Sequence, residues 1–295
     1  MQPIIKCENL THYYGQRLIY EGLSFEVPEG RILGLLGKNG TGKTTTINIL
    51  NGYLKPAHGS CYLFGEEIRQ MNPLTKQRIA LLIEGHVQYA FMNVRQLERF
   101  YAKFYPKWDQ KIYHELIDLL KIAPHQKVSN MSCGQRSQVV LALLLAQNAD
   151  LLILDDFSLG LDPGYRRLFI EYLRDYAKQH NKTVFLTSHI IQDMEKLIDD
   201  CIILDYGKIL LQMPIDELMQ RFKRYTFSVD PSLKALPEDE EFYYHSVAFS
   251  TAEIHSFRDE DYIREYLTRH QISFHDLKEE DMTLEDAFIG LTGKY

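Results

Sequence analysis

The chain has 295 residues, 45% of them hydrophobic, so it can bury the core of one large domain or two modest domains. Its formal charge of −7 is uneven: residues 1–218 carry 24 basic and 24 acidic side chains, whereas residues 219–295 carry 9 and 16. A protein that binds nucleic-acid phosphates is expected to have more basic than acidic side chains, so this charge balance argues against a nucleic-acid partner.

The sequence also lacks the patterns of secreted and membrane-spanning chains. Its first residues contain no long apolar core of a signal peptide, and its most apolar stretch, residues 139–154, is interrupted by Gln147, Asn148 and Asp150. Four scattered cysteines form no C-x-x-C pair, which argues against a zinc site or a dense disulfide framework. We therefore expect a cytoplasmic protein without a membrane-spanning helix.

The N-terminal part is expected to be rich in β-structure. Alternating or apolar runs predict strands at residues 4–10, 23–28, 30–36 and 61–64. Directly after the third of these strands comes the glycine-rich sequence GKNGTGKTT, and after that the first turns of a helix at residues 46–51. The order strand, glycine loop, helix is the one that a phosphate-binding P-loop requires.

Each residue type in this loop suits the binding of a nucleotide. Glycines let backbone N–H groups surround an anion, and the helix N-terminus adds its dipole. Lys43 is placed to reach the β- and γ-phosphates, and Thr44 offers a hydroxyl to Mg²⁺. The residues predicted to bind ATP here are Gly37, Lys38, Asn39, Gly40, Thr41, Gly42, Lys43, Thr44 and Thr45.

The middle of the chain changes from helical to α/β patterns. Apolar residues recur at three- and four-residue steps between about residues 93 and 146, and continuous apolar runs then predict buried parallel strands at 151–155 and 183–187. The first run ends in Asp155 and Asp156, at the edge where α/β sheets hold ligands. Asp155 suits a metal ion, and Asp156 is placed to orient or deprotonate an attacking water.

A second anion site is predicted at residues 131–135, MSCGQ, where Ser132 is a candidate N-cap and Gly134 permits close backbone approach. With the tetrad at residues 132–135 about 20 residues before the acidic strand, the chain resembles the nucleotide-binding subunit of an ATP-binding cassette (ABC) transporter. The resemblance implies a signature motif that closes on the γ-phosphate held by another subunit. Its members here are Ser132, Cys133, Gly134 and Gln135.

Further motifs follow in the order of that family. Residues 158–162, SLGLD, resemble the D-loop with Asp162, and His189 resembles the switch histidine that senses the γ-phosphate. Tyr14 stands 29 residues before Lys43, where the family has an aromatic that stacks on adenine, although a core role for Tyr14 stays open. The resemblance assigns catalysis to Lys43, Asp156 and His189.

Three positions depart from the family pattern. Glu84 replaces the usual glutamine and is a predicted Mg²⁺ ligand together with Thr44 and Asp155. Asp156 replaces the usual catalytic glutamate and is one methylene shorter, from which we expect slow hydrolysis. Cys133 replaces a glycine, either as a small residue or as a redox-sensitive thiol.

The resemblance covers residues 1–218 and implies an α/β fold. It predicts a RecA-like P-loop NTPase core with a β-rich N-terminal subdomain and a helical insertion at about residues 85–147. Residues 219–295 are expected to form a small α+β domain with strands at 225–229, 242–249 and 272–277, a helix near 260–270 and a last helix opened by Thr283. The ending at residues 284–293 resembles that of bacterial ABC-2 type exporter ATPases.

The resemblance implies an ATPase that powers a membrane exporter through ATP-dependent dimer closure. The implied partners are a second ATPase subunit, identical or different, and a separate permease, which would hold the chain at the inner face of the cell membrane. The permease is expected to dock in a groove near residues 85–108, lined by Tyr89, Phe91, Phe104 and Trp108, although these aromatics also suit the core of the helical part. The C-terminal domain could dock the permease, strengthen the dimer or regulate hydrolysis.

Two other classes of protein share the P-loop. In a soluble ABC ATPase of DNA repair, long coiled coils would separate the P-loop from the signature motif, whereas Lys43 and Ser132 are only 89 residues apart. A ribosomal member would carry two cassettes in one chain. A small-molecule kinase would leave His189 and the tetrad at residues 132–135 unexplained. The transported substrate is not encoded in this chain's motifs.

Overall fold

A computed structural model describes residues 3–83, 89–158 and 160–293. The chain divides into two compact units, Met1–Ile209 and Leu210–Tyr295, which meet within strand β10 (Lys208–Pro214). The sequence analysis places the domain boundary after residue 218, within helix α8 (Ile215–Arg221).

A parallel sheet forms the centre of the N-terminal unit. Its parallel strands are, in spatial order, β9 (Asp200–Asp205), β3 (Ile32–Gly37), β8 (Thr183–Thr187), β7 (Leu151–Leu154) and β6 (Ile79–Leu82). β7 and β8 are buried along their whole length and β3 along nearly all of it, which explains the continuous apolar sequences that predicted them. Their carboxyl ends therefore meet at one edge, where ligands of α/β sheets bind.

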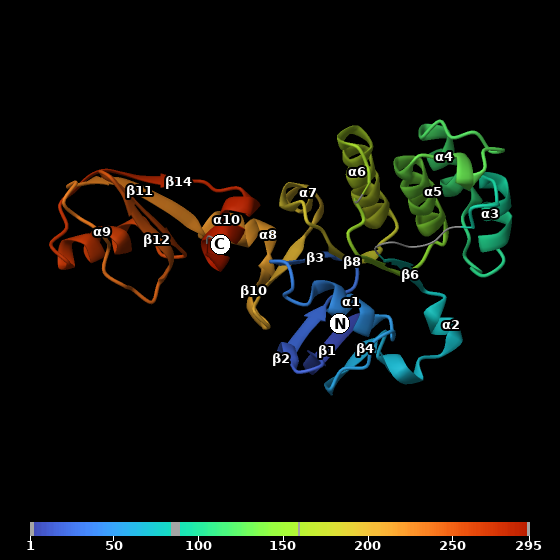
Figure 1. Cartoon of the computed structure of the whole chain (residues 1–295), viewed down its shortest axis with the longest axis horizontal. Helices are drawn as coiled ribbons and strands as arrows, with labels where there is room; N and C mark the ends of the chain where they lie inside the picture. The colour runs from blue at the N-terminus through green and yellow to red at the C-terminus, as the bar shows by residue number, and fades with distance from the viewer. Residues whose placement is uncertain (1–2, 84–88, 159, 294–295) are drawn as a thin grey trace. The chain divides into compact units, whose positions relative to one another are not determined.

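A second, antiparallel sheet is built from the N-terminal strands and packs with helix α1 (Lys43–Leu50) in one apolar core (Figure 1). Its strands are β2 (Arg17–Val27), β1 (Ile5–Tyr14), β4 (His58–Leu63) and β5 (Glu66–Glu67), in this spatial order. The predicted strands at 4–10 and 23–28 are parts of one long hairpin, whose register pairs Tyr14 with Arg17. This hairpin carries Tyr14 to the neighbourhood of the phosphate loop.

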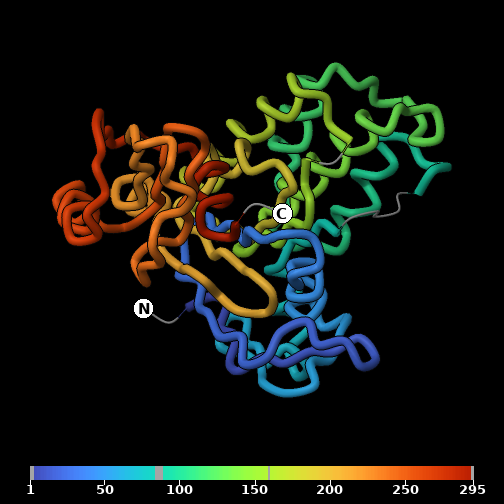
Figure 2. Tube along the Cα trace, turned by 60° about the vertical axis from the view of Figure 1, so that its left-hand side comes forward, coloured from blue at the N-terminus to red at the C-terminus, as the bar shows by residue number. Residues whose placement is uncertain are grey.

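Three helices occupy the segment with helical periodicity, and Figures 1 and 2 show them grouped together, in colours from teal to yellow-green. They are α3 (Val94–Tyr101), α4 (Gln110–Leu119) and α5 (Cys133–Ala146). Helices α3 and α5 each begin with a capping box. The side chains of Asn93 and Ser132 accept the backbone N–H of Gln96 and Gln135, whose side chains accept the backbone N–H of Asn93 and Ser132 in return. The remaining helices of this unit are α2 (Pro73–Lys76), α6 (Pro163–Gln179) and α7 (Ile191–Leu197).

The C-terminal unit is an antiparallel sheet with helices. Its strand order is β12 (Phe242–Ala248), β13 (Thr251–Ser256), β11 (Lys223–Val229) and β14 (Phe274–Glu280), accompanied by α9 (Glu260–Arg269) and α10 (Leu284–Thr292). The sequence analysis missed β13, which forms a tight hairpin with β12 and pairs Ala248 with Thr251. Thr283 caps the last helix with Asp286, as the sequence predicts. Within the described part of the whole chain, no helix has the length and hydropathy needed to cross a membrane.

Candidate functional site

The loop between β3 and α1 has the backbone of an anion cradle. Gly40 and Gly42 have φ angles of +82° and +102°, which residues with side chains rarely adopt. A Cβ atom on Gly42 would also lie only 2.8 Å from side-chain atoms of Ile19 and Tyr20. No side chain among the described residues caps the N-terminus of α1, so its first N–H groups are available to a phosphate.

Lys43 lies against the loop that it follows. Its ammonium group donates hydrogen bonds to the carbonyl oxygens of Gly37 and Lys38, at 2.7 and 3.0 Å. The hydroxyl of Thr41 donates to the same carbonyl of Lys38 at 2.8 Å, which tightens the loop. Burial lowers the pKa of Lys43 below its usual value, while the negative charges of Asp156 and Asp155 act in the opposite direction.

Asp155 is a buried carboxylate surrounded by hydroxyl groups. It is 2% exposed, and its Oδ1 accepts a hydrogen bond of 2.6 Å from Thr187 and lies 3.5 Å from the hydroxyl of Thr44. Thr187 ends β8, the neighbour of β7, so the parallel register brings it beside Asp155. The sequence analysis missed Thr187, although its position at the end of a predicted strand was the signal that could have found it.

Asp156 and His189 form a directly linked pair. Asp156 has a φ of +48°, in the left-handed region that aspartate tolerates better than most residues. Its Oδ1 accepts the backbone N–H of His189 at 3.0 Å, and its Oδ2 lies 2.5 Å from Nε2 of the same histidine. The backbone N–H of Asp156 donates to the Thr187 hydroxyl at 3.2 Å. The two side chains are therefore held in one orientation beside Asp155.

These groups line one open cavity of about 300 Å³. The predicted residues that line it are Tyr14, Asn39, Gly40, Gly42, Lys43, Thr44, Thr45, Asp155, Asp156 and His189. The structure adds Arg17, Ile19 and Thr187 to its walls. Residues from the hairpin, the phosphate loop and the ends of β7 and β8 are thus brought together as the sequence motifs require.

Tyr14 stands at the rim of this cavity. Its side chain is 49% exposed, so it is not a core residue, and its hydroxyl lies 3.4 Å from that of Thr45. The ring meets His12 edge-on, with the ring centroids 4.9 Å apart. An exposed aromatic face beside a phosphate loop is suited to stacking on a planar base.

The tetrad at residues 132–135 forms a separate site at the N-terminus of α5. The Ser132 hydroxyl accepts a hydrogen bond of 3.2 Å from the backbone N–H of Gln135. In return, the side-chain oxygen of Gln135 accepts a hydrogen bond of 3.1 Å from the backbone N–H of Ser132. A Cβ atom on Gly134 would lie 3.3 Å from the carbonyl oxygen of Gly160, so the tetrad packs against the loop before α6. The cavity that contains Lys43 is lined by no member of the tetrad.

Cys133 of the tetrad is the first residue of α5, and Asp162 is the N-cap of α6. Cys133 is an exposed free thiol, and its Sγ lies 3.2 Å from where a Cβ on Gly160 would be. Asp162 caps α6 by accepting the backbone N–H groups of Gly164 and Tyr165, at 3.0 and 3.2 Å. Asp162 therefore has a structural role in holding this loop. Glu84, the third predicted metal ligand, lies outside the described residues.

The four aromatics of the expected docking groove do not form one cluster. Tyr89 and Phe104 are both about half exposed, and the ring of Phe100 contacts them, with centroids 5.0 and 5.1 Å away. Phe91 is 70% exposed and contacts Tyr89. Trp108 instead packs on Tyr113 of α4, at 5.8 Å. Tyr89, Phe91 and Phe104 are therefore the three exposed aromatics, whereas Trp108 packs within the helical segment.

Comparisons with known proteins agree with this geometry. The family model described as ABC transporter matches residues 20–158. The bacitracin transport ATP-binding protein BcrA of Bacillus licheniformis is 33% identical over 227 residues, which cover 76% of this chain and 74% of that protein. Nod factor export ATP-binding protein I of Cupriavidus metallidurans is 30% identical over 224 residues, 74% of each chain.

A solved structure has the same fold. It is the structure of the ATP binding subunit of an ABC transporter, and it superposes with a TM-score of 0.66 over 74% of this chain and 92% of that chain. At 22% sequence identity, this likeness concerns the fold alone.

Proposed function

Because the chain belongs to the ABC transporter family of ATP-binding proteins and is an ATPase of the P-loop fold, we propose that it powers an exporter. In this proposal the permease is a separate chain, and two ATPase subunits close on ATP between them. Sequence similarity to a Nod factor export ATP-binding protein supports the direction of transport.

The residues of the cavity have complementary roles in this proposal. The ATP phosphates occupy the loop around Gly40 and Gly42, and Lys43 exchanges its bonds with the loop carbonyls for bonds with the β- and γ-phosphates. The adenine stacks on Tyr14, whose exposed ring borders the same cavity. Because the loop is already folded around the lysine, little reorganisation is needed when the nucleotide enters.

Hydrolysis relies on the pair formed by Asp156 and His189. Asp156 orients the attacking water and takes its proton as the water oxygen bonds to the γ-phosphorus and the bond to ADP breaks. His189, held by Asp156 through its backbone and its ring, contacts the γ-phosphate. The short aspartate side chain makes this reaction slow compared with an enzyme whose base has a longer reach.

The hydroxyl of Thr44 and the buried carboxylate of Asp155 suit Mg²⁺, because both offer hard oxygen ligands 3.5 Å apart at the edge of the phosphate cavity. Among the described residues, no group of three or more acidic, histidine or cysteine side chains is arranged to hold a metal ion. Mg²⁺ commonly keeps several waters and binds phosphate oxygens, so a site with few protein ligands suits it. When bound, Mg²⁺ neutralises charge that develops on the phosphates.

The separation of the tetrad from the cavity is the observation that carries the dimer proposal. Ser132 and Gly134 lie at a helix N-terminus, which attracts anions, and yet they do not line the cavity of their own chain. A second chain can bring its tetrad onto the γ-phosphate held by the first. ATP then stabilises the closed dimer through contacts that exist only in that state, and hydrolysis removes them.

This proposal predicts an ATP-dependent dimer, which size-exclusion chromatography with light scattering can measure. Asp156→Asn is expected to slow hydrolysis, so this variant should elute as a dimer with ATP and Mg²⁺ and as a monomer without nucleotide. Adding Ser132→Arg should leave it monomeric with ATP, because the arginine side chain fills the space that the γ-phosphate contact needs. A dimer that forms equally well with this substitution would contradict the proposed role of the tetrad.

A further inference from the structure

Two of the four cysteines of this chain lie opposite each other in the N-terminal sheet. Cys7 on β1 and Cys61 on β4 are 54 residues apart in the sequence, yet the antiparallel register pairs them directly. Their Sγ atoms are 3.5 Å apart, close enough for a hydrogen bond between the two thiols. Both are free thiols, so the fold brings a reduced pair into contact without joining it.

The backbone at this pair suits a disulfide bond. Residues directly opposite in an antiparallel pair have Cα atoms about 4.5–5.5 Å apart, within the range of about 4.4–6.8 Å that disulfides span. A bond of about 2.0 Å between the sulfur atoms can therefore form by rotation of the two side chains, without a change of register. The neighbouring pairs, Lys6 with Tyr62 and Glu8 with Ser60, hold the register on both sides.

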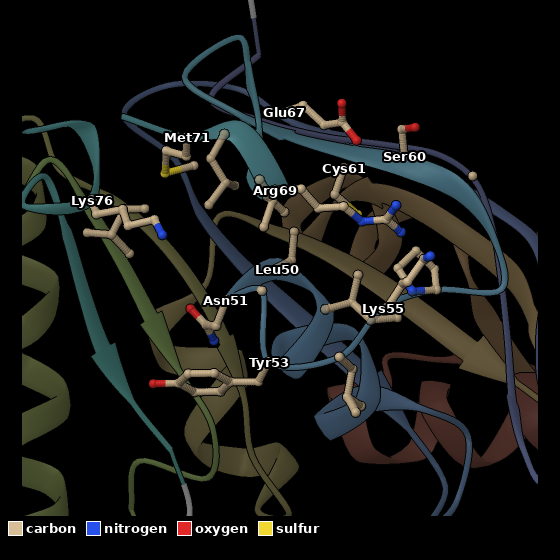
Figure 3. A pocket seen from close by; sticks show the side chains of 18 of the residues that line it. Leu50, Asn51, Tyr53, Lys55, Ser60, Cys61, Glu67, Arg69, Met71 and Lys76 are labelled. Atoms are coloured by element: carbon tan, nitrogen blue, oxygen red, sulfur yellow. The ribbon is translucent and has the colours of Figure 1, made fainter. Parts of the chain in front are cut away.

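The two thiols differ in their access to solvent. Cys7 is 2% exposed and Cys61 is 5% exposed, and both belong to the apolar core that includes residues of α1. Cys61 also lines a surface cavity of about 560 Å³, and Figure 3 labels it among the side chains of that cavity. A molecule little larger than water can therefore reach Cys61. Burial raises the pKa of the Cys7 thiol well above its usual value, which keeps Cys7 protonated.

We propose that Cys7 and Cys61 are a redox modification site, in which hydrogen peroxide joins them in a reversible disulfide between the two strands. The Cys61 thiolate bonds to one peroxide oxygen, the O–O bond breaks, and the second oxygen leaves as hydroxide, which takes up a proton. The Cys7 sulfur then attacks the Cys61 sulfenic acid, the S–O bond breaks, and the hydroxyl group leaves with the Cys7 proton as water. In total the two thiols lose two electrons and two protons, and the peroxide is reduced to two molecules of water.

Peptide mapping of the folded, full-length chain tests this proposal. The chain is treated with peroxide, its remaining thiols are alkylated in denaturant, and it is digested with trypsin for mass spectrometry. Trypsin leaves Cys7 in residues 7–17 and Cys61 in residues 44–69, because Lys55 precedes a proline and is not cut. We expect these two peptides to be joined, with the sum of their masses less the two lost hydrogen atoms. Dithiothreitol should separate them again.

The other two cysteines serve as controls. Cys133 is exposed, so its oxidation in the same digest shows that the peroxide reached the protein. Cys201 is buried on β9 of the parallel sheet, and Cys201→Ala is the matched control, which should leave the linked peptides unchanged. Absence of the linked peptides from a sample in which Cys133 is oxidised would overturn the proposal. Linked peptides that form only after the chain is denatured would overturn it as well.

Cys7→Ala tests the order of the two steps. This variant lacks the thiol that resolves the sulfenic acid, and it replaces a buried side chain by a smaller apolar one. The Cys61 sulfenic acid should therefore persist, and dimedone, which reacts with sulfenic acids, should label residues 44–69 in the variant but not in the parent chain. If dimedone labelled neither chain at these residues, Cys61 would not be the thiol that attacks the peroxide.

Discussion

Replacing Lys43 by alanine is expected to lower ATP turnover by roughly 10²- to 10³-fold, the loss typical when a preorganised electrostatic donor is removed. Lys43 is only 8% exposed, and its ammonium group donates to two carbonyl oxygens of the phosphate loop. Alanine offers no charge to the β- and γ-phosphates. Steady-state phosphate release measures the loss, and fluorescence titration with a labelled ATP analogue reports the accompanying fall in affinity.

Lys111→Ala is the control for this substitution. Lys111 is 84% exposed on α4 and takes no part in the cavity, so its removal should leave turnover within twofold of the parent. Circular dichroism of Lys43→Ala should retain the parent's helical signal, since the loop glycines keep their conformation. A Lys43→Ala chain that is folded and hydrolyses ATP at more than a tenth of the parent's rate would show that the phosphate site lies elsewhere.

Replacing Asp156 by asparagine is expected to reduce hydrolysis by about 10²- to 10⁴-fold while ATP binding persists, because a general base contributes this much to the rate. The asparagine side chain has the same size and can still accept the backbone N–H of His189, so the loop should keep its shape. What it lacks is a group able to take a proton from water. Single-turnover hydrolysis separates this chemical step from binding and release.

Asp156→Glu supplies the matched comparison. It keeps the carboxylate and lengthens the side chain, although glutamate adopts a φ of +48° less readily than aspartate. We expect this variant to retain at least a tenth of the parent's rate. If asparagine hydrolysed ATP as fast as aspartate, Asp156 would not be the base, and the water would have to be positioned by another group.

Local patterns in the sequence predicted the elements that carry the site. The glycine loop, the apolar strands β3, β7 and β8, the N-cap of Ser132 and the capping box of Thr283 each depend on neighbouring residues, and the structure contains all of them. The fold class, a P-loop NTPase core with a small α+β unit, was also recognisable from motif order. Such local consistency is what a foldable sequence requires.

The features that were missed depend on pairing between distant segments. Arg17 enters the cavity wall only because the β1–β2 hairpin places it opposite Tyr14, and Thr187 does so because β8 pairs with β7. The sequence of strand β13, TAEIHS, has no clear strand pattern, and the strand forms because it pairs with β12. Trp108 packs on Tyr113 rather than with the exposed aromatics, which the spacing of residues along the chain could not reveal.

The central claim is that each ATP site combines the loop of one chain with the tetrad of another, and paired variants in purified, doubly tagged dimers test it most directly. A dimer of one Lys43→Ala chain and one Ser132→Arg chain keeps one complete site only if the tetrad acts across the dimer. A dimer of one parent chain and one chain with both substitutions keeps a complete site only if the tetrad acts within its own chain. We predict about half of the parent ATPase rate for the first pair and almost none for the second, if the two sites turn over independently; activity in the second pair alone would contradict the account.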